Sequence, residues 1–404
     1  MFWRVIVARL QVSAETAAHP AATGWPLLRL GFRPFYLGAS AYAVLAMGLW
    51  FLVFTGRMEV APRLSPVLWH AHEMLYGFVV AVIVGFLLTA GRVWTQLSTP
   101  RGPALGALFA LWAAGRVAAA SGPYMLFFLL DGSFLIIVAA VFAGLLLRAG
   151  NRRNAAVGAV LALLALANVL FHLAVLAVVP IDPMRAIYAA IALVVLLECI
   201  IGGRVIPQFS RNAVPGLQLA VSPRRELLAA AVTSIGLLAW VLGAPATATA
   251  VLLAAAAVLQ ALRLLSWKPW RSLGRPILWV LHLGYAWIPV GLALLAAAQA
   301  GWIPASPALH ALTVGSMGGL IIGMLTRTAR GHTARPLQAG PVEVAAYAAL
   351  FLAALVRVAT PLLLPALSVP ALLASGLLWM LGFAGYLARF APWLFATRLD
   401  GRDG

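Results

Sequence analysis

The sequence Trp69-His70-Ala71-His72-Glu73-Met74 stands directly before an apolar run that extends over residues 75–90. A run of this length, together with its flank, is typical of a helix that crosses a bilayer. Two imidazoles and a carboxylate at the start of such a helix are energetically costly unless something binds them. Ionisable groups at membrane depth therefore indicate a functional site, and other residues of the chain are expected to share it.

The composition excludes a water-soluble globular protein. Hydrophobic residues make up 64% of the 404 residues and charged residues only 9%, which is typical of an integral membrane protein. The net charge of +18 comes from Lys and Arg residues in short connections between apolar runs, as membrane topology requires, and not from a basic soluble domain. We therefore expect the lipid bilayer, and no nucleic acid, as a partner.

The chain has a single cysteine, Cys199, which lies inside an apolar run. Disulfides and thiolate metal clusters are therefore excluded. The sequence also lacks a Cys-x-x-Cys-His motif, so any haem would be held non-covalently.

Apolar runs of about 20 residues predict an all-α, polytopic transmembrane bundle of about twelve spans. The domain comprises residues 35–392, between a cytoplasmic N-terminal arm at 1–34 and a cytoplasmic C-terminal tail at 393–404. The predicted helices are 35–54, 70–91, 102–120, 124–147, 155–179, 185–203, 226–242, 246–267, 277–300, 307–329, 342–364 and 369–392.

The distribution of positive charge predicts the orientation. With the N-terminus in the cytoplasm, 23 Lys and Arg residues fall inside and three outside, and two more lie within helices. This agrees with the positive-inside rule and predicts that both termini are cytoplasmic.

This topology sorts the histidines by depth. Four of the seven belong to the outer half, and they are His70, His72, His172 and His310. His282 and His332 belong to the inner half, and His19 lies in the polar N-terminal arm. Neutral imidazole is the commonest metal ligand and the usual axial ligand of non-covalent haem.

Each of these histidines also has a simpler interpretation. His70 and His72 are about 200° apart on a regular helix, so one metal would not easily bind both. Interfacial histidines can also simply bond to a loop or a lipid headgroup. His172 can be a buried imidazole that is satisfied by Asn168, four residues before it.

Two arginines, Arg116 and Arg357, lie within helices in the outer half. Haem propionates are carboxylates and favour arginine as a bidentate partner. Ion pairs with Asp131 or Glu73 are the alternative for both arginines, and the sequence leaves both interpretations open.

The tenth predicted helix contains Gly315, Gly319 and Gly323. Two overlapping GxxxG spacings allow close approach of another helix or of a flat macrocycle. The run that follows at 327–333 is polar, and either flanks the membrane or binds an anionic group or a quinone head.

The chain resembles the NnrS family in several stretches. They are Leu30-Gly31-Phe32-Arg33-Pro34-Phe35-Tyr36, residues 69–77, Gly85-Phe86-Leu87-Leu88-Thr89-Ala90, His310-Ala311-Leu312-Thr313-Val314-Gly315 and Thr326-Arg327-Thr328. The resemblance implies a polytopic protein of the bacterial inner membrane that carries haem b and copper. It also implies a role in nitric-oxide metabolism and in relief of nitrosative stress.

The resemblance places the family's histidines at His70, His72, His172, His282, His310 and His332, without assigning a metal to each. Six histidines equal the ligand total of haem-copper oxidases, and His72-x-x-x-Tyr76 is similar to the His–Tyr pair of those enzymes. The six split between the two membrane faces, which is a departure from that pattern.

We therefore expect an outer site of haem and copper built by the second, fifth and tenth helices, with His72, His172 and His310 around a shared cavity. The expected function is capture of nitric oxide, with redox turnover left open and quinol or another donor as the electron source. Two alternatives are a secondary transporter and a non-catalytic haem or copper sensor or assembly factor. The chain shows no convincing internal repeat, which disfavours transporters built from repeated halves. The sequence leaves the axial ligands and the oligomeric state open.

Overall fold

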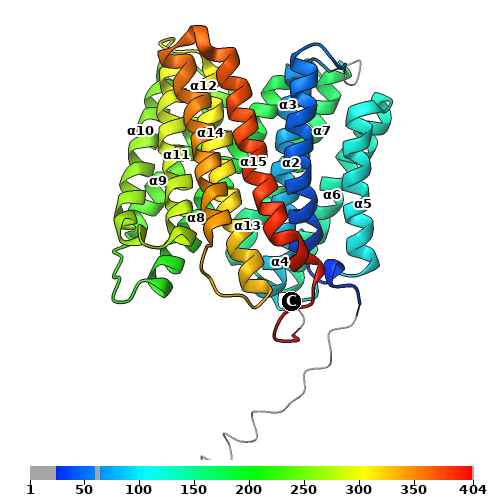
Figure 1. Ribbon diagram of the computed structural model, residues 1–404. Coiled ribbons are helices and arrows are strands. Elements are labelled where there is room, and N and C mark those ends of the chain that lie inside the picture. Colours follow the sequence, from blue (N-terminus) through cyan, green and yellow to red (C-terminus); the bar gives the residue numbers. More distant parts are fainter. Residues whose placement is uncertain (1–23, 60–63, 403–404) are drawn as a thin grey trace, which may run out of the picture.

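The computed structural model describes residues 24–59 and 64–402, and within them all regular elements are helical (Figure 1). Twelve helical spans of this described part are long enough and apolar enough to cross a membrane. The prediction of an all-α, polytopic membrane bundle is confirmed. His19 lies outside the described residues.

The spans follow one another as a simple up-and-down series. They are α2 (Phe32–Phe54), α3 (Pro66–His72) with η2 (Glu73–Val79) and α4 (Val80–Thr95), α5 (Pro103–Ser121), α6 (Tyr124–Arg148), α7 (Ala155–Val175), α8 (Pro183–Ala213), α9 (Pro223–Leu242), α10 (Ala246–Ser266), α11 (Pro276–Gln299), α12 (Ala305–His310) with η5 (Ala311–Gly318) and α13 (Gly319–His332), α14 (Pro341–Leu363) and α15 (Ser368–Phe395).

Proline marks the beginning of many of these helices. Its fixed φ suits the first helical turn, where a backbone N–H has no intrahelical partner. Helices α3, α5, α8, α9, α11 and α14 begin at Pro66, Pro103, Pro183, Pro223, Pro276 and Pro341. The first span begins at Phe32, three residues before the predicted boundary, and the last ends at Phe395, three residues after it.

The largest boundary error is at α8, which was predicted to end at residue 203 and continues to Ala213. A glycine pair, Arg204 and Pro207 stand at the predicted end. Instead, Arg204 Nη1 donates to Asn154 Oδ1 at 2.9 Å, and Pro207 is buried within the continuing helix. Arg204 and Pro207 therefore stand inside a long helix and do not end it.

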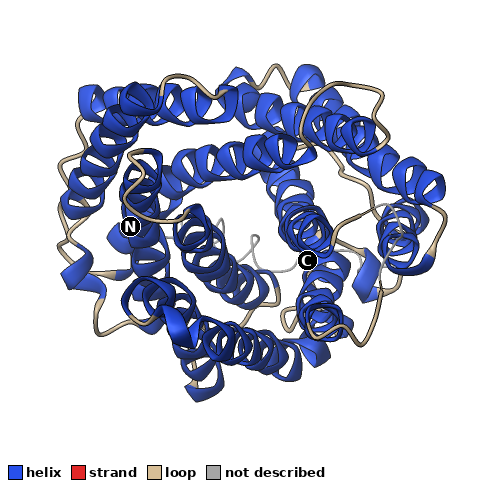
Figure 2. Cartoon of the chain, turned by 90° about the horizontal axis from the view of Figure 1, so that it is seen from above, coloured by secondary structure: helices blue, strands red, loops and turns tan. Residues whose placement is uncertain are grey.

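Two spans occupy the centre of the molecule. Their most apolar windows are 78% buried in Pro66–Thr95 and 72% buried in Ala305–His332, against at most 56% in any other described span. Seen along the helices, an oval arrangement of helices surrounds others in its interior (Figure 2). Each central span contains a π-helix, η2 in one and η5 in the other.

The glycine spacing of the tenth span serves helix packing. A Cβ at Gly319 would lie 2.6 Å from Phe351 and 3.0 Å from Gly284 Cα of α11. Gly315 packs against Trp287 and Gly323 against Leu281 in the same way. Of the two interpretations of this motif, the structure therefore supports close approach of helices, not of a macrocycle.

Candidate functional site

Each π-helix begins directly after outer histidines. His70 and His72 close α3 ahead of η2, and His310 closes α12 ahead of η5. A π-helix widens the backbone to i→i+5 bonding and occurs frequently at functional sites. In this protein it changes the direction in which residues of the central spans face, relative to a continuous α-helix.

A cavity of about 630 Å³ lies between the two central spans. Its size is within the range of small-molecule and cofactor sites. The walls are mainly apolar and come from α2, α3, η2, α8, α12, η5, α14 and α15. Its larger apolar side chains include Trp50, Met74, Phe78, Met317 and Trp379.

The basic groups of this cavity are His70, His310 and Arg357. The His70 ring stacks on Trp50 with centroids 4.4 Å apart, and its buried Nδ1 has no hydrogen-bond partner among the described residues. His310 Nδ1 lies 2.7 Å from the carbonyl oxygen of Ser306 and donates to it. This bond fixes the tautomer, so that His310 Nε2 keeps its lone pair for a ligand.

Arg357 stands beside this pair without a carboxylate partner among the described residues. Its Nη2 donates to Ser306 Oγ at 3.3 Å, and it lines the same cavity as His70 and His310. Of the two interpretations of Arg357, the one that leaves it available to an anionic group in the cavity agrees with this arrangement.

A second group, the buried polar cluster, contains none of the residues that line the cavity. It consists of Tyr42, His72, Glu73, Arg116, Tyr124, Asp131, Asn168 and His172, from six elements of the chain. Arg116 is ion-paired with Asp131 and donates to Glu73 Oε1 at 2.6 Å, and Tyr42 donates to the other oxygen of Glu73. The arginine therefore bridges two carboxylates in the membrane interior.

The two histidines of the cluster converge on one oxygen atom. His72 Nε2 and His172 Nε2 lie 3.4 and 3.2 Å from Asp131 Oδ2. One ligand atom each from His72, Asp131 and His172 lies within 4.8 Å of the others. The opposite ring nitrogens are held by Glu73 Oε1 at 2.9 Å and by the Tyr124 hydroxyl at 3.0 Å, which is how outer groups orient metal-ligating histidines.

The hydrogen bonds of His72 leave room for a cation. Its Nδ1 donates to Glu73, while Nε2 faces two acceptor oxygens, Asn168 Oδ1 at 3.0 Å and Asp131 Oδ2. A neutral ring would oppose a lone pair to these oxygens. Two carboxylates against one arginine also leave one negative charge unbalanced. A proton on His72 or a bound metal cation satisfies both requirements.

The prediction that His72, His172 and His310 surround one cavity is wrong. The structure joins His72 with His172 in the polar cluster, and His70 with His310 at the cavity. His70 and His72 point in different directions because two helical residues differ by about 200°. The second span thus contributes one histidine to each group.

For Arg116 the sequence left a propionate partner and an ion pair open, and its guanidinium is paired with Glu73 and Asp131 inside the polar cluster. The ion-pair alternative is the one that the structure supports. Arg116 is buried and is not among the residues that line the cavity.

The two inner histidines join neither group. His282 Nδ1 donates to the carbonyl oxygen of Leu278 at 3.1 Å, and Ser210 and Ser272 lie 3.4 and 3.3 Å from its ring nitrogens. The His332 ring packs on Phe32 with centroids 5.4 Å apart. Sequence reasoning named both as ligands, but it missed the central position of Asp131, which it had considered only as an ion-pair partner.

A family model described as the NnrS protein matches residues 26–398, nearly the whole chain. The chain belongs to the NnrS family. No curated protein is similar enough to match. The family assignment agrees with the multi-pass membrane architecture, and both groups of histidines lie within the part of this NnrS protein that the family model covers.

Proposed function

We propose that this NnrS protein is located in the bacterial inner membrane and binds haem b in its cavity and copper in its polar cluster. We also propose that it captures nitric oxide at these sites. Family membership supports a role in the nitric-oxide response. The observation that carries the haem proposal is the mainly apolar cavity whose lining includes two imidazoles and one arginine.

The residues of the cavity fit a haem. Its volume of about 630 Å³ and mainly apolar walls suit a flat macrocycle. His310 would hold the haem iron, because Ser306 holds Nδ1 and leaves Nε2 for a ligand. Arg357 is the candidate partner of a propionate, because arginine binds carboxylates in a bidentate manner.

The residues of the polar cluster fit a copper ion. His72, Asp131 and His172 would hold it, with Glu73 and Tyr124 orienting the imidazoles. The excess negative charge favours a bound cation, and imidazole nitrogens are ligands that suit copper. Uncharged nitric oxide partitions into the bilayer, and a reduced haem or Cu(I) supplies the site to which it binds.

Absorption spectroscopy of the detergent-solubilised protein tests the haem proposal. We expect a b-type Soret band that shifts when nitric oxide is added. His310→Ala should lose the band, and His70→Ala should change its response to nitric oxide. His282→Ala is the matched control and should keep the wild-type spectrum, because His282 lies outside the cavity.

A colourless protein without metal contradicts the proposal, as does a His310→Ala variant with the wild-type spectrum. Copper analysis of His72→Ala and His172→Ala tests the second centre, and both should lose copper while His332→Ala retains it. Nitric-oxide electrode measurements then separate turnover from capture alone, with a quinol supplied as electron donor.

A further inference from the structure

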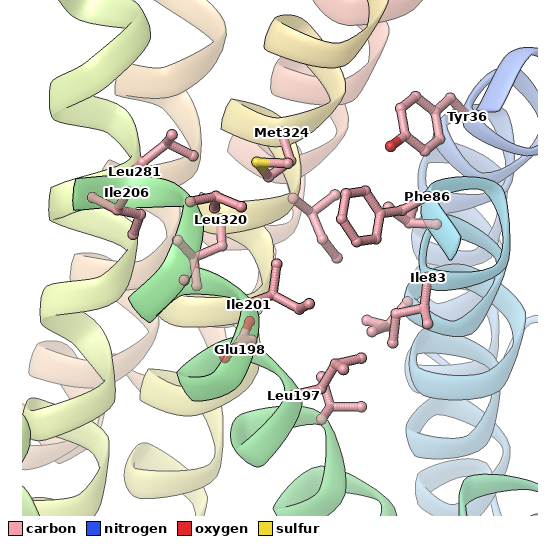
Figure 3. Close-up of a pocket in the computed structure, with 16 residues that line it drawn as sticks. Tyr36, Ile83, Phe86, Leu197, Glu198, Ile201, Ile206, Leu281, Leu320 and Met324 are labelled. Atoms are coloured by element: carbon pink, nitrogen blue, oxygen red, sulfur yellow. The ribbon is translucent and has the colours of Figure 1, made fainter. Parts of the chain in front are cut away.

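A second hollow, smaller than the cavity, lies between α8 and α4 (Figure 3). It has a volume of about 100 Å³, and its walls come from α2, η2, α4, α8, α11 and α13. Nearly all lining side chains are apolar, including Ile83, Phe86 and Leu320. Glu198 of α8 and Tyr36 of α2 are the titratable exceptions among the described residues that line it.

Glu198 has no cationic neighbour in this pocket. Its Oε2 accepts a hydrogen bond from the Ser316 hydroxyl at 2.7 Å, and the described lining contains no Lys, Arg or His. An ionised carboxylate without a cation is very costly in an apolar environment. The other carboxylates of the membrane interior differ, because Glu73 and Asp131 share Arg116, and Glu226 pairs with Arg263.

The pocket and the cofactor cavity are adjacent. Val79, the last residue of η2, lines both of them. Ser316, which binds Glu198, belongs to η5, and its neighbour Met317 lines the cavity. Glu198 therefore contacts the same π-helix that forms one wall of the cavity.

Tyr36 lies on the side of the pocket that faces the predicted cytoplasmic side of the membrane. Tyr36 lies in the second turn of α2, and the outer histidines lie near the opposite ends of their spans. Its phenol is the only other lining group that can pass a proton among the described residues. Glu198 thus lies between a hydroxyl toward the predicted cytoplasmic face and a hydroxyl toward the cavity.

We propose that Glu198 is a neutral carboxylic acid that transfers protons from the apolar pocket to the cofactor cavity by way of Ser316. Protonatable residues inside membranes commonly serve as proton relays. The need for a proton rests on the proposed function, because reduction of a buried cofactor by one electron from a quinol adds a negative charge in a low dielectric.

The charge balance is one proton for one electron. The Ser316 hydroxyl, which donates to Glu198 Oε2 in the structure, first rotates toward the cavity. The O–H bond of Glu198 then breaks and its proton passes to Ser316 Oγ, while the Ser316 O–H bond breaks and its proton passes to a carboxylate of the cofactor in the cavity. No electron moves through these groups. The carboxylate then regains a proton from the side of Tyr36, so that one proton enters for each electron and the acid is restored.

Infrared spectroscopy tests this proposal without requiring a cofactor. The purified protein at neutral pH should show a carboxylic-acid C=O band that is absent in Glu198→Gln and displaced in Ser316→Ala. The band should move when H₂O is replaced by D₂O, because a transferable proton exchanges. Glu226→Gln is the matched control and should keep the band, since Glu226 is ion-paired with Arg263.

Reduction of the haem-loaded protein with dithionite should perturb the same band, and Glu198→Asp should retain an acid band at a new position. A missing band, or a band that does not exchange in D₂O, overturns the proposal. If the protein proves to contain no haem, the proposed function fails, and the band and its exchange still decide whether Glu198 is an exchangeable acid. Glu198→Gln should leave the Soret band and its shift with nitric oxide unchanged.

Discussion

At the scale of single residues, Arg116 and Arg357 have different roles inside the membrane. Arg116 holds two buried carboxylates together, whereas Arg357 faces the cavity and donates only to Ser306 among the described residues. Both looked alike in the sequence, because each is one cation inside an apolar run. Their difference depends on which side chains other helices bring to them.

Arg116→Gln should destabilise the protein strongly. Glu73 and Asp131 would remain buried without their cation, and removal of one partner from a buried ion pair costs about 3–5 kcal/mol. Thermal unfolding in detergent, followed by tryptophan fluorescence, should show a large decrease in Tm. Arg357→Gln is the control and should unfold close to wild type, while it weakens retention of haem. Equal effects of the two substitutions would contradict this assignment.

The sequence identified most of the site residues but not their grouping. Histidines and arginines in apolar runs are visible because lipid excludes them. Their partners depend on contacts among α3, α5, α6 and α7, which hydropathy does not encode. Asp131 shows the consequence, since it is the residue on which both imidazoles of the polar cluster converge.

At the scale of elements, the π-helices are the feature that hydropathy could not predict. A π-helix has the same apolar composition as an α-helix, so the two central spans were predicted simply as long helices. The span boundaries were otherwise accurate because proline and polar connections mark them. The α8 extension was missed because the glycine pair and Pro207 are typical of a helix end, whereas Pro207 is buried within the continuing helix.

Deletion of Val314 should convert η5 into a regular α-helix. A π-helix turns less per residue than an α-helix, so seven α-helical residues turn the chain about as far as the eight residues of η5, and His310 should keep its orientation toward the cavity. The variant should remain folded by size-exclusion chromatography and keep the Soret band. Loss of the band in the Val314 deletion would show that the wide turn of η5 itself is needed to position His310.

Gly284→Ala should destabilise the contact between α11 and the tenth span. The added Cβ would lie 2.8 Å from Leu320 N and 2.9 Å from Gly319 C, which are backbone atoms that cannot move aside easily. Overpacking of this kind costs about 1–3 kcal/mol. Gly144→Ala is the control, because its Cβ would meet nothing within 4 Å. Thermal unfolding should separate the two variants, and equal Tm values would argue against tight packing there.

At the scale of the whole molecule, twelve spans followed directly from apolar runs of sufficient length, since the bilayer imposes that length on every helix. The orientation is still a prediction, based on 23 positive residues on one side and three on the other. Labelling of exposed positions at the two ends of a span decides it.

Cysteine labelling in intact cells tests the orientation. Cys199 is buried, so the native chain provides little background. Trp302 and Leu273 are 81% and 69% exposed and flank the two ends of α11. Trp302→Cys should react with a membrane-impermeant maleimide from outside, and Leu273→Cys only after permeabilisation. The reverse pattern would invert the predicted topology.

The spacing of His70 and His72 couples the cavity to the polar cluster. A single alanine separates the two imidazoles, and the same backbone stretch forms the partition between the cavity and the polar cluster. Any axial slip or rotation of α3 therefore displaces a ligand candidate in both compartments at once. A movement of this segment therefore cannot retune one compartment without the other, whereas His70→Ala and His72→Ala each act on one compartment alone.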